Sequence, residues 1–192
     1  MEDMIEIRWH GRGGQGAKTA SQLVADAALD EDMFIQAFAE YGPERMGAPI
    51  QCFTRISKKP IKIHCHAQTP DVVAVLDPTL VGSEDVTSGM KEDGILLVNT
   101  PEAPAEIRKQ LPDVKVKIYT VDASGIASEA IGRPIPNTPM IGALTKVTGL
   151  IKIDRLKESL RKKFSSKLKE EIIEGNIKAV ERAYEEVKSD EA

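Results

Sequence analysis

Short apolar runs alternate with helical stretches along the first two-thirds of the chain, and this alternation limits the folds that the chain can adopt. Two of the runs, Val72–Leu76 and Gly94–Val98, contain no polar side chain. Uninterrupted runs of this kind are typical of strands that are buried on both faces of a parallel sheet. The same pattern predicts strands over Met4–Trp9, Met33–Phe38 and Val114–Val121.

The stretches between these runs have the residue spacing of helices. In Ala17–Leu29, apolar residues three and four positions apart share one helix face: Ala20, Leu23, Val24, Ala27 and Ala28. Pro101–Leu111 is a second expected helix, with a proline near its first turn. Strands that alternate with helices predict an α/β fold, here a Rossmann-like, mostly parallel sheet flanked by helices.

Two regions depart from the alternation. Ile50–Ile56 and Ile61–His66 are extended runs separated by Ser57–Pro60, which predicts a β-hairpin appended to the parallel sheet. Beyond residue 150, apolar residues recur at helical spacing on both sides of Ser165–Ser166 and predict two amphipathic C-terminal helices. We therefore expect one domain over residues 1–192, with an α/β core at 1–150 and helices at 151–192. The charged faces of these helices are either solvated surface or a docking surface for a partner.

Composition excludes several classes of protein. Hydrophobic residues make up 41% of the 192 residues, enough for a globular core, but no apolar run approaches the roughly 18 residues of a membrane span. The N-terminus, Met1–Asp3, is acidic where a signal peptide is basic. A net charge of −4 argues against nucleic-acid binding. We expect a soluble cytoplasmic protein with no nucleic-acid or membrane partner.

A glycine-rich turn joins the first strand to the first helix. It matches the pattern G-x-G-x-x-G in the strand–turn–helix context that this pattern requires: Gly11, Arg12, Gly13, Gly14, Gln15 and Gly16. Glycines allow a tight turn and a close approach of backbone to ligand, and the N–H groups at the following helix N-terminus attract anions. Arg12 adds a full positive charge, so the turn predicts an anion-binding site.

Several interpretations of this turn remain open. A dinucleotide site calls for a carboxylate about 20 residues further on, at the end of the second strand, yet none occurs before Glu40. A nucleotide-triphosphate loop calls for lysine directly after the last glycine, but Ala17 separates Gly16 from Lys18. The turn can also contact a phosphate or a partner without the full dinucleotide apparatus, or serve only close strand–helix packing.

Two further segments have unusual sequences. The loop after the second strand has a fixed, irregular path set by glycines and prolines and carries a charged pair: Tyr41, Gly42, Pro43, Glu44 and Arg45. Because ligands gather where loops leave the carboxyl ends of strands, this loop and the glycine-rich turn should share one rim. Later, three prolines lead into a short helix, with Asn137 or Thr138 as its N-cap and Pro139 at its first position.

Three motifs in this order and at these separations resemble the signature of the gamma subunits of 2-oxoacid:ferredoxin oxidoreductases: Gly11–Gly16, Tyr41–Arg45 and Asn137–Ala143. The likeness is greatest to the gamma subunits of pyruvate:ferredoxin oxidoreductases (pyruvate synthases), and it covers nearly the whole chain. One departure is Met46–Gly47–Ala48, where such proteins usually have two glycines after the arginine.

The resemblance implies a heterotetrameric enzyme of anaerobic metabolism that oxidatively decarboxylates pyruvate to acetyl-coenzyme A and CO2 and passes the electrons to ferredoxin. It places thiamine diphosphate, Mg and the [4Fe–4S] clusters in partner alpha, beta and delta subunits. This chain has neither the four-cysteine cluster motif nor the thiamine diphosphate motif, so we expect no catalytic residue in it and no activity alone.

For this subunit the resemblance implies a role in binding coenzyme A and closing the active site, through the turn at residues 11–16, the loop at 41–45, and Asn137 and Thr138. Three alternatives remain. The enzyme can act on 2-oxoisovalerate, 2-oxoglutarate or indolepyruvate instead of pyruvate. The chain can be a stand-alone dinucleotide-binding oxidoreductase. It can also be a purely structural assembly subunit.

A cluster of cysteine and histidine suggests a zinc site at first sight. In the expected hairpin Cys52 faces Cys65, but His64 and His66 point to the opposite face because side chains alternate along a strand. The four groups therefore cannot converge on one metal without a bulge. We expect two ordinary thiols that lie near each other, with a disulfide as the alternative in a hyperthermophilic source.

Overall fold

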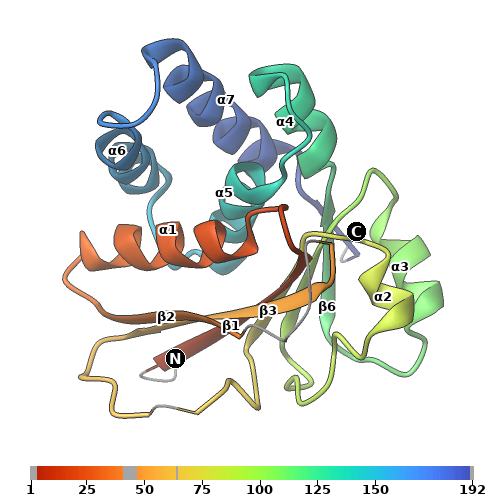
Figure 1. Cartoon of the computed structure of the whole chain (residues 1–192). Helices are drawn as coiled ribbons and strands as arrows, with labels where there is room; N and C mark the ends of the chain where they lie inside the picture. The colour runs from red at the N-terminus through yellow and green to blue at the C-terminus, as the bar shows by residue number, and fades with distance from the viewer. Residues whose placement is uncertain (1–3, 41–46, 64, 191–192) are drawn as a thin grey trace.

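The computed structural model describes residues 4–40, 47–63 and 65–190, which form a seven-stranded mixed sheet between two layers of helices (Figure 1). The strand order is β2-β3-β1-β4-β5-β6-β7. The strands are β1 (Met4–Arg12), β2 (Phe34–Glu40), β3 (Pro49–Ser57), β4 (Val72–Val75), β5 (Ile95–Asn99), β6 (Lys117–Val121) and β7 (Lys188–Ser189). The four central strands, β1, β4, β5 and β6, are parallel, which confirms the predicted α/β sheet.

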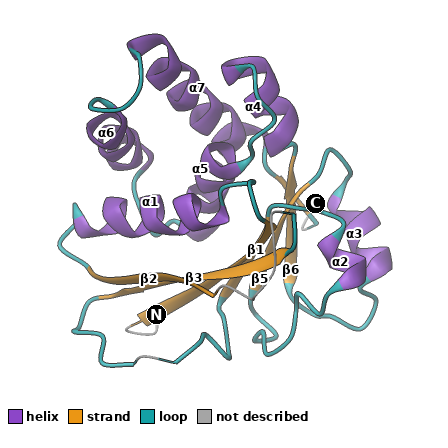
Figure 2. Ribbon diagram, in the orientation of Figure 1, coloured by secondary structure: helices purple, strands orange, loops and turns teal. Residues whose placement is uncertain are grey.

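The helices divide unequally between the two faces of the sheet (Figure 2). One face carries α2 (Leu80–Ser83) and α3 (Pro104–Gln110). The other face carries α1 (Ala17–Leu29), α4 (Ala123–Ile131), α5 (Asn137–Thr148), α6 (Ile153–Phe164) and α7 (Glu170–Glu186). The two predicted C-terminal helices are thus confirmed as α6 and α7, and they pack on α1 and α5 rather than on the sheet itself.

The predicted hairpin is wrong in its second strand. The antiparallel hairpin at the edge of the sheet consists of β2 and β3, with Phe34 opposite Ser57, and β3 also pairs with β1. Both edges of β3 are therefore occupied, and Ile61–Ile63 and the residues after 64 form no strand. Instead, Arg55 in β3 donates a hydrogen bond to the carbonyl of Cys65, and Gln36 in β2 donates one to Ile63.

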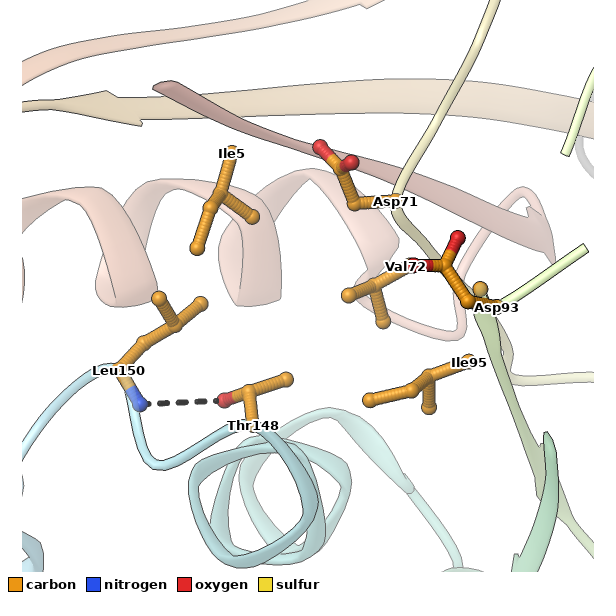
Figure 3. A pocket seen from close by; sticks show the side chains of 8 residues that line it. Ile5, Asp71, Val72, Asp93, Ile95, Thr148 and Leu150 are labelled. Carbon is orange, nitrogen blue, oxygen red and sulfur yellow. Dashed lines mark hydrogen bonds between the residues drawn. The ribbon is translucent and has the colours of Figure 1, made fainter. Parts of the chain in front are cut away.

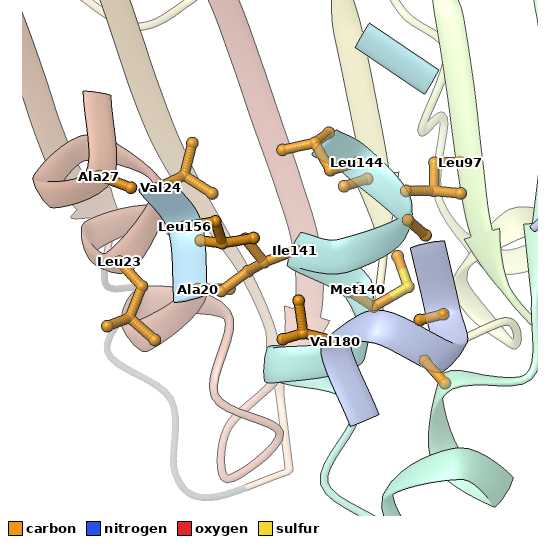
Figure 4. Close-up of a cluster of buried hydrophobic side chains, with 14 of the residues drawn as sticks. Ala20, Leu23, Val24, Ala27, Leu97, Met140, Ile141, Leu144, Leu156 and Val180 are labelled. Carbon is orange, nitrogen blue, oxygen red and sulfur yellow. The ribbon is translucent and has the colours of Figure 1, made fainter. Parts of the chain in front are cut away.

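The main core lies between the sheet and the larger helical layer (Figure 4). Ala20, Val24 and Ala27 of α1 and Met140, Ile141 and Leu144 of α5 supply much of it, and all are buried. The helices approach each other closely where side chains are small. A Cβ on Gly142 of α5 would lie 2.2 Å from the carbonyl oxygen of Val180 in α7, so glycine sets this spacing.

A hydrogen-bonded relay joins this helical layer to the sheet. The indole Nε1 of buried Trp9 donates to Thr54 Oγ1 at 3.0 Å, and that hydroxyl donates to the carbonyl of Ser21 in α1, also at 3.0 Å. Both polar side chains are therefore satisfied inside the core, and α1 is fixed over β1 and β3. Within the described ranges, no helix combines the length and the apolar character needed to cross a bilayer.

Candidate functional site

The glycine-rich turn lies at the carboxyl end of β1, where neighbouring strands lead to helices on opposite faces of the sheet. From the carboxyl end of β1 the chain enters α1 on one face, whereas from the neighbouring end of β4 it enters α2 on the other. In open α/β sheets a crevice forms at such a switch point, and ligands bind there. The segments Gly11–Gly16 and Asp77–Thr79 lie at this switch point.

The turn is held in shape by its own side chains and by its glycines. Gln15 folds back so that its Oε1 accepts a hydrogen bond from the backbone N–H of Arg12 at 2.7 Å. Gly16 has a φ of +83°, in the left-handed region that other residues rarely adopt, and α1 begins directly after it. A Cβ on Gly16 would lie 2.7 Å from Nδ2 of Asn137, so this position also requires glycine for space.

Arg12 forms an ion pair at the switch point with a carboxylate that sequence reasoning missed. Its Nε lies 3.2 Å from Oδ2 of Asp77, and the same oxygen accepts a hydrogen bond from Gln15 Nε2 at 2.7 Å. The other oxygen, Oδ1, accepts from the N–H and the hydroxyl of Thr79 at 3.0 and 2.6 Å. Arg12 also donates to Thr79 Oγ1 at 3.1 Å and to the carbonyl of Gly47 at 3.3 Å.

These contacts keep Asp77 ionised. Burial by itself would raise the pKa of this carboxyl, but hydrogen bonds from Thr79 and Gln15, together with the charge of Arg12, outweigh burial and lower the pKa. The second strand has no carboxylate before Glu40, but Asp77 places a negative charge beside the turn. The available signal was the polar Asp77–Thr79 directly after a buried strand, at the rim where parallel strands end.

The loop residues Tyr41, Gly42, Pro43, Glu44 and Arg45 lie outside the described part of the chain, so the prediction for them stays a prediction. The residues that follow them do meet the glycine-rich turn. The N–H of Gly13 donates to the carbonyl of Ala48 at 3.1 Å, and Arg12 reaches Gly47. Gly47 and Ala48 thus lie at the same rim as the turn.

The third motif also reaches this rim, although its helix begins earlier than expected. α5 starts at Asn137 with Pro136 as its N-cap, so the prediction of Asn137 or Thr138 as the cap and Pro139 at the first position is wrong. The reason is that Asn137 turns its Oδ1 to the N–H of Thr138, at 2.8 Å, and not to a residue further along the helix. That bond directs Nδ2 of Asn137 towards Gly16.

The N-terminus of α1 lacks a side-chain cap. Gly16 offers no capping side chain, and the first turn of the helix contains no acidic residue. The first N–H groups of a helix have no partner within it and carry partial positive charge. Helix N-termini of this kind attract anions, and the amide of Asn137 lies next to this one, at Gly16.

Beneath the turn, Arg8 and His10 are buried on the face of β1 opposite α1. Arg8 donates to His10 Nε2 at 3.0 Å and to the carbonyls of Val86 and Ser88. Burial, and secondly the charge of Arg8, lowers the pKa of His10 to about 3. His10 is therefore a neutral hydrogen-bond acceptor at physiological pH, and it fixes Arg8 under the site rather than taking part in it.

Two other places in the described part of the chain were candidates for a site. A small pocket of about 170 Å3 at the amino ends of β4 and β5 is lined by apolar side chains and by three polar ones, Asp71, Asp93 and Thr148 (Figure 3). Asp71 is already engaged by the N–H of Glu6 and by Lys91, both at 2.8 Å. Cys52 is buried in β3 and Cys65 is exposed, both as free thiols, and burial raises the pKa of Cys52 to about 11. They do not face each other, and His64 lies outside the described residues.

Within the described ranges, no three or more His, Cys, Asp or Glu side chains come together as a metal site. The groups that the structure brings together at the turn are main-chain N–H groups, one arginine, two amide side chains and the carboxylate of Asp77.

Comparison with known proteins shows to which family the chain belongs. Residues 6–186 match the family model described as pyruvate ferredoxin/flavodoxin oxidoreductase. The chain belongs to this family. The resemblance predicted from the three motifs is confirmed, and the chain is of the gamma-subunit type of 2-oxoacid:ferredoxin oxidoreductases.

Curated members of the family are similar over their whole length. The pyruvate synthase subunit PorC of Thermotoga maritima is 48% identical over 97% of this chain and 96% of its own. The pyruvate/ketoisovalerate oxidoreductases common subunit gamma of Thermococcus kodakarensis is also 48% identical, over 94% and 96%. The crystal structure of pyruvate oxidoreductase subunit PORC from Thermotoga maritima superimposes with a TM-score of 0.88 at 45% identity, covering 99% of this chain and 100% of that one. These relatives are subunits of oxidoreductase complexes, so other subunits are partners of this family.

Proposed function

We propose that this chain is the gamma subunit of an enzyme that converts pyruvate and coenzyme A to acetyl-coenzyme A and CO2, passing two electrons to ferredoxin. The proposed partners are alpha, beta and delta subunits and, through them, ferredoxin. Thiamine diphosphate in a partner subunit would supply the carbanion chemistry of decarboxylation. The residues of this chain would bind and orient coenzyme A and help exclude water, and none of them acts as acid, base or nucleophile.

The uncapped N-terminus of α1 at the switch point is the observation that carries the coenzyme A proposal. Coenzyme A contains three phosphate groups, and a phosphate placed there meets helix N–H groups and the amide of Asn137. Arg12 is joined to Asp77 but lies only partly buried, with about a third of its side chain exposed, so it can exchange Asp77 for a phosphate. Asp77 keeps its hydrogen bonds from Thr79 after such an exchange.

The choice of 2-oxoacid is proposed to rest with other subunits. The relative from Thermococcus kodakarensis is named as a subunit common to pyruvate and ketoisovalerate oxidoreductases. One gamma chain therefore serves two substrates there. We infer that the glycine-rich turn in this chain likewise binds what the reactions share, coenzyme A, whether the 2-oxoacid is pyruvate or a larger one.

The test is the Arg12→Ala substitution in the assembled enzyme. Loss of one charge-assisted contact costs about 1.5–3 kcal/mol, so the KM for coenzyme A should rise roughly 10-fold or more while the KM for pyruvate stays the same. Arg155→Ala removes an exposed arginine of α6 that pairs with Glu158, and it serves as the matched control.

A structural role is the second candidate for the turn, because Arg12 and Gln15 are both bound to Asp77 within the chain. Unchanged kinetics for coenzyme A in Arg12→Ala, combined with weaker assembly of the complex, would favour that role. Unchanged kinetics and unchanged assembly would mean that Arg12 contributes neither to coenzyme A binding nor to assembly of the complex.

A further inference from the structure

A pocket that does not include the glycine-rich turn opens between the helices of the larger layer. It has a volume of about 320 Å3 and lies between the α4–α5 connection, the end of α6 and the start of α7. We call it the α4–α7 pocket; it is lined by Ile131, Arg133, Ile135, Asn137, Thr138, Phe164, Leu168, Ile172 and Asn176. Five of these side chains are aliphatic or aromatic, and Leu168, in the α6–α7 connection, is 40% exposed.

The side chains of Thr138 and Asn176 in the wall of the pocket are already hydrogen-bonded. The buried Thr138 hydroxyl donates to Asn176 Oδ1 at 2.8 Å, and Asn176 Nδ2 donates to the carbonyl of Ile172 at 2.7 Å. Asn137 Oδ1 is engaged by Thr138. A polar ligand such as a nucleobase would find few hydrogen-bond partners here, whereas an apolar group gains from burial without breaking any bond.

Basic residues line or flank the pocket, and Glu170 and the exposed Glu171 follow them in the chain. Arg133 makes no side-chain hydrogen bond or ion pair with any described residue. Lys167 and Lys169 flank Leu168 and are exposed. The nearest acid that follows, Glu170, is turned towards Arg161, with 3.6 Å between Oε1 and Nη1. The pocket therefore combines an apolar lining with the guanidinium of Arg133, which pairs with no described residue. A bulky apolar side chain with a carboxylate beside it would be complementary to this combination.

We propose that the α4–α7 pocket receives a segment of another subunit of the same enzyme, with one or two bulky apolar side chains in the pocket and an Asp or Glu on Arg133. A cavity of about 150 Å3 holds a benzene ring, so about 320 Å3 suits two groups of that size. The family consists of subunits that function in complexes, and an exposed apolar patch rimmed by charge is typical of a protein interface. Because Asn137 borders both this pocket and Gly16, the segment would dock next to the glycine-rich turn.

The test places the photo-crosslinking residue p-benzoylphenylalanine at Leu168 in the assembled enzyme. Illumination should join this chain to one peptide of a partner subunit, and that peptide should contain a large apolar residue within a few positions of an Asp or Glu. Leu29, at the far end of α1 and 55% exposed, is the control position. Cross-linking at Leu168 no stronger than at Leu29 would overturn the proposal.

Two other results of the same experiment would also overturn it. A cross-link to a second copy of this chain would make the pocket a self-association site. A cross-link that saturating coenzyme A abolishes would make it part of a ligand site.

Charge variants test the rim independently. Arg133→Glu should weaken association with the partner subunits at least about 10-fold, whereas Arg133→Lys should stay within about 3-fold of the unchanged chain. The fold of the chain should be unaffected, since Arg133 has no described partner, and circular dichroism of the isolated chain checks this. Equal association of the Arg133→Glu and Arg155→Glu chains would contradict the assigned carboxylate.

Discussion

Replacement of Gly16 by alanine should weaken the site through two separable effects. The first is conformational, because a φ of +83° costs an alanine about 1–2 kcal/mol. The second is steric, because the new Cβ would lie 2.7 Å from Nδ2 and 3.0 Å from Cβ and Cγ of Asn137. Asn137 must move, which strains its bonds to the N–H and hydroxyl of Thr138, each worth about 1 kcal/mol. The free energy of unfolding should fall by about 2–4 kcal/mol.

Gly14 supplies the matched control for this prediction. It also has a positive φ, +101°, but a Cβ there would meet no atom within 4 Å. Gly14→Ala should therefore cost only the conformational part, about 1–2 kcal/mol. Urea denaturation of the isolated chain, followed by far-ultraviolet circular dichroism, gives both free energies.

The difference between the two variants measures the contact of the turn with α5. It should be about 1–2 kcal/mol, and it should shrink when Asn137→Gly is combined with Gly16→Ala, because the obstructing side chain is then absent. Equal losses in Gly14→Ala and Gly16→Ala, or a difference that persists in the Asn137→Gly background, would refute the packing of Gly16 against Asn137.

Two further predictions concern the interior. His10 stays neutral down to a pKa of about 3 when folded but takes up a proton below about 6.5 when unfolded, so stability falls as the pH drops from 6.5 towards 3. The loss should be about 2 kcal/mol between pH 7 and pH 5, and His10→Gln should remove it in urea titrations, whereas the exposed His66→Gln should not. Gly142→Ala should cost about 2–3 kcal/mol because its Cβ would reach the Val180 carbonyl at 2.2 Å, and Gly82→Ala, with open space, should not; thermal melts compare them.

Elements with their own periodicity could be predicted from the sequence. α1 has the expected bounds, Ala17–Leu29, because its apolar spacing and the glycines that precede it agree. β4 and β5 follow from apolar runs that only a doubly covered strand explains. The convergence of the glycine-rich turn with Gly47–Ala48 also followed from topology, since loops that leave one sheet edge lie side by side.

Pairing between segments could not be predicted in the same way. Ile61–Ile63 and the residues after 64 have the composition of a strand, but β2 already occupies the edge of β3 on which they would pair. The segment is held by side chains instead, chiefly by Arg55, which is 1% exposed. No local sequence pattern shows which of two candidate strands will pair with the free edge of a third strand.

Asp77 escaped prediction for a related reason. Its role depends on β4 lying next to β1, which places the carboxylate beside Arg12 although 65 positions separate the two residues. A polar residue at the end of a buried strand was the available clue. Its partner could be named only from the strand order.

The account's central claim is that this chain works as a subunit whose partners carry the redox chemistry. The most direct test is to tag the chain in its native cells, purify it gently without oxygen, and record a native mass spectrum. We predict that the chain copurifies with three further subunits carrying iron and thiamine diphosphate, and that the complex reduces ferredoxin only when pyruvate and coenzyme A are both present. A lone chain or a homo-oligomer without iron, under conditions shown to preserve such complexes, would contradict the account.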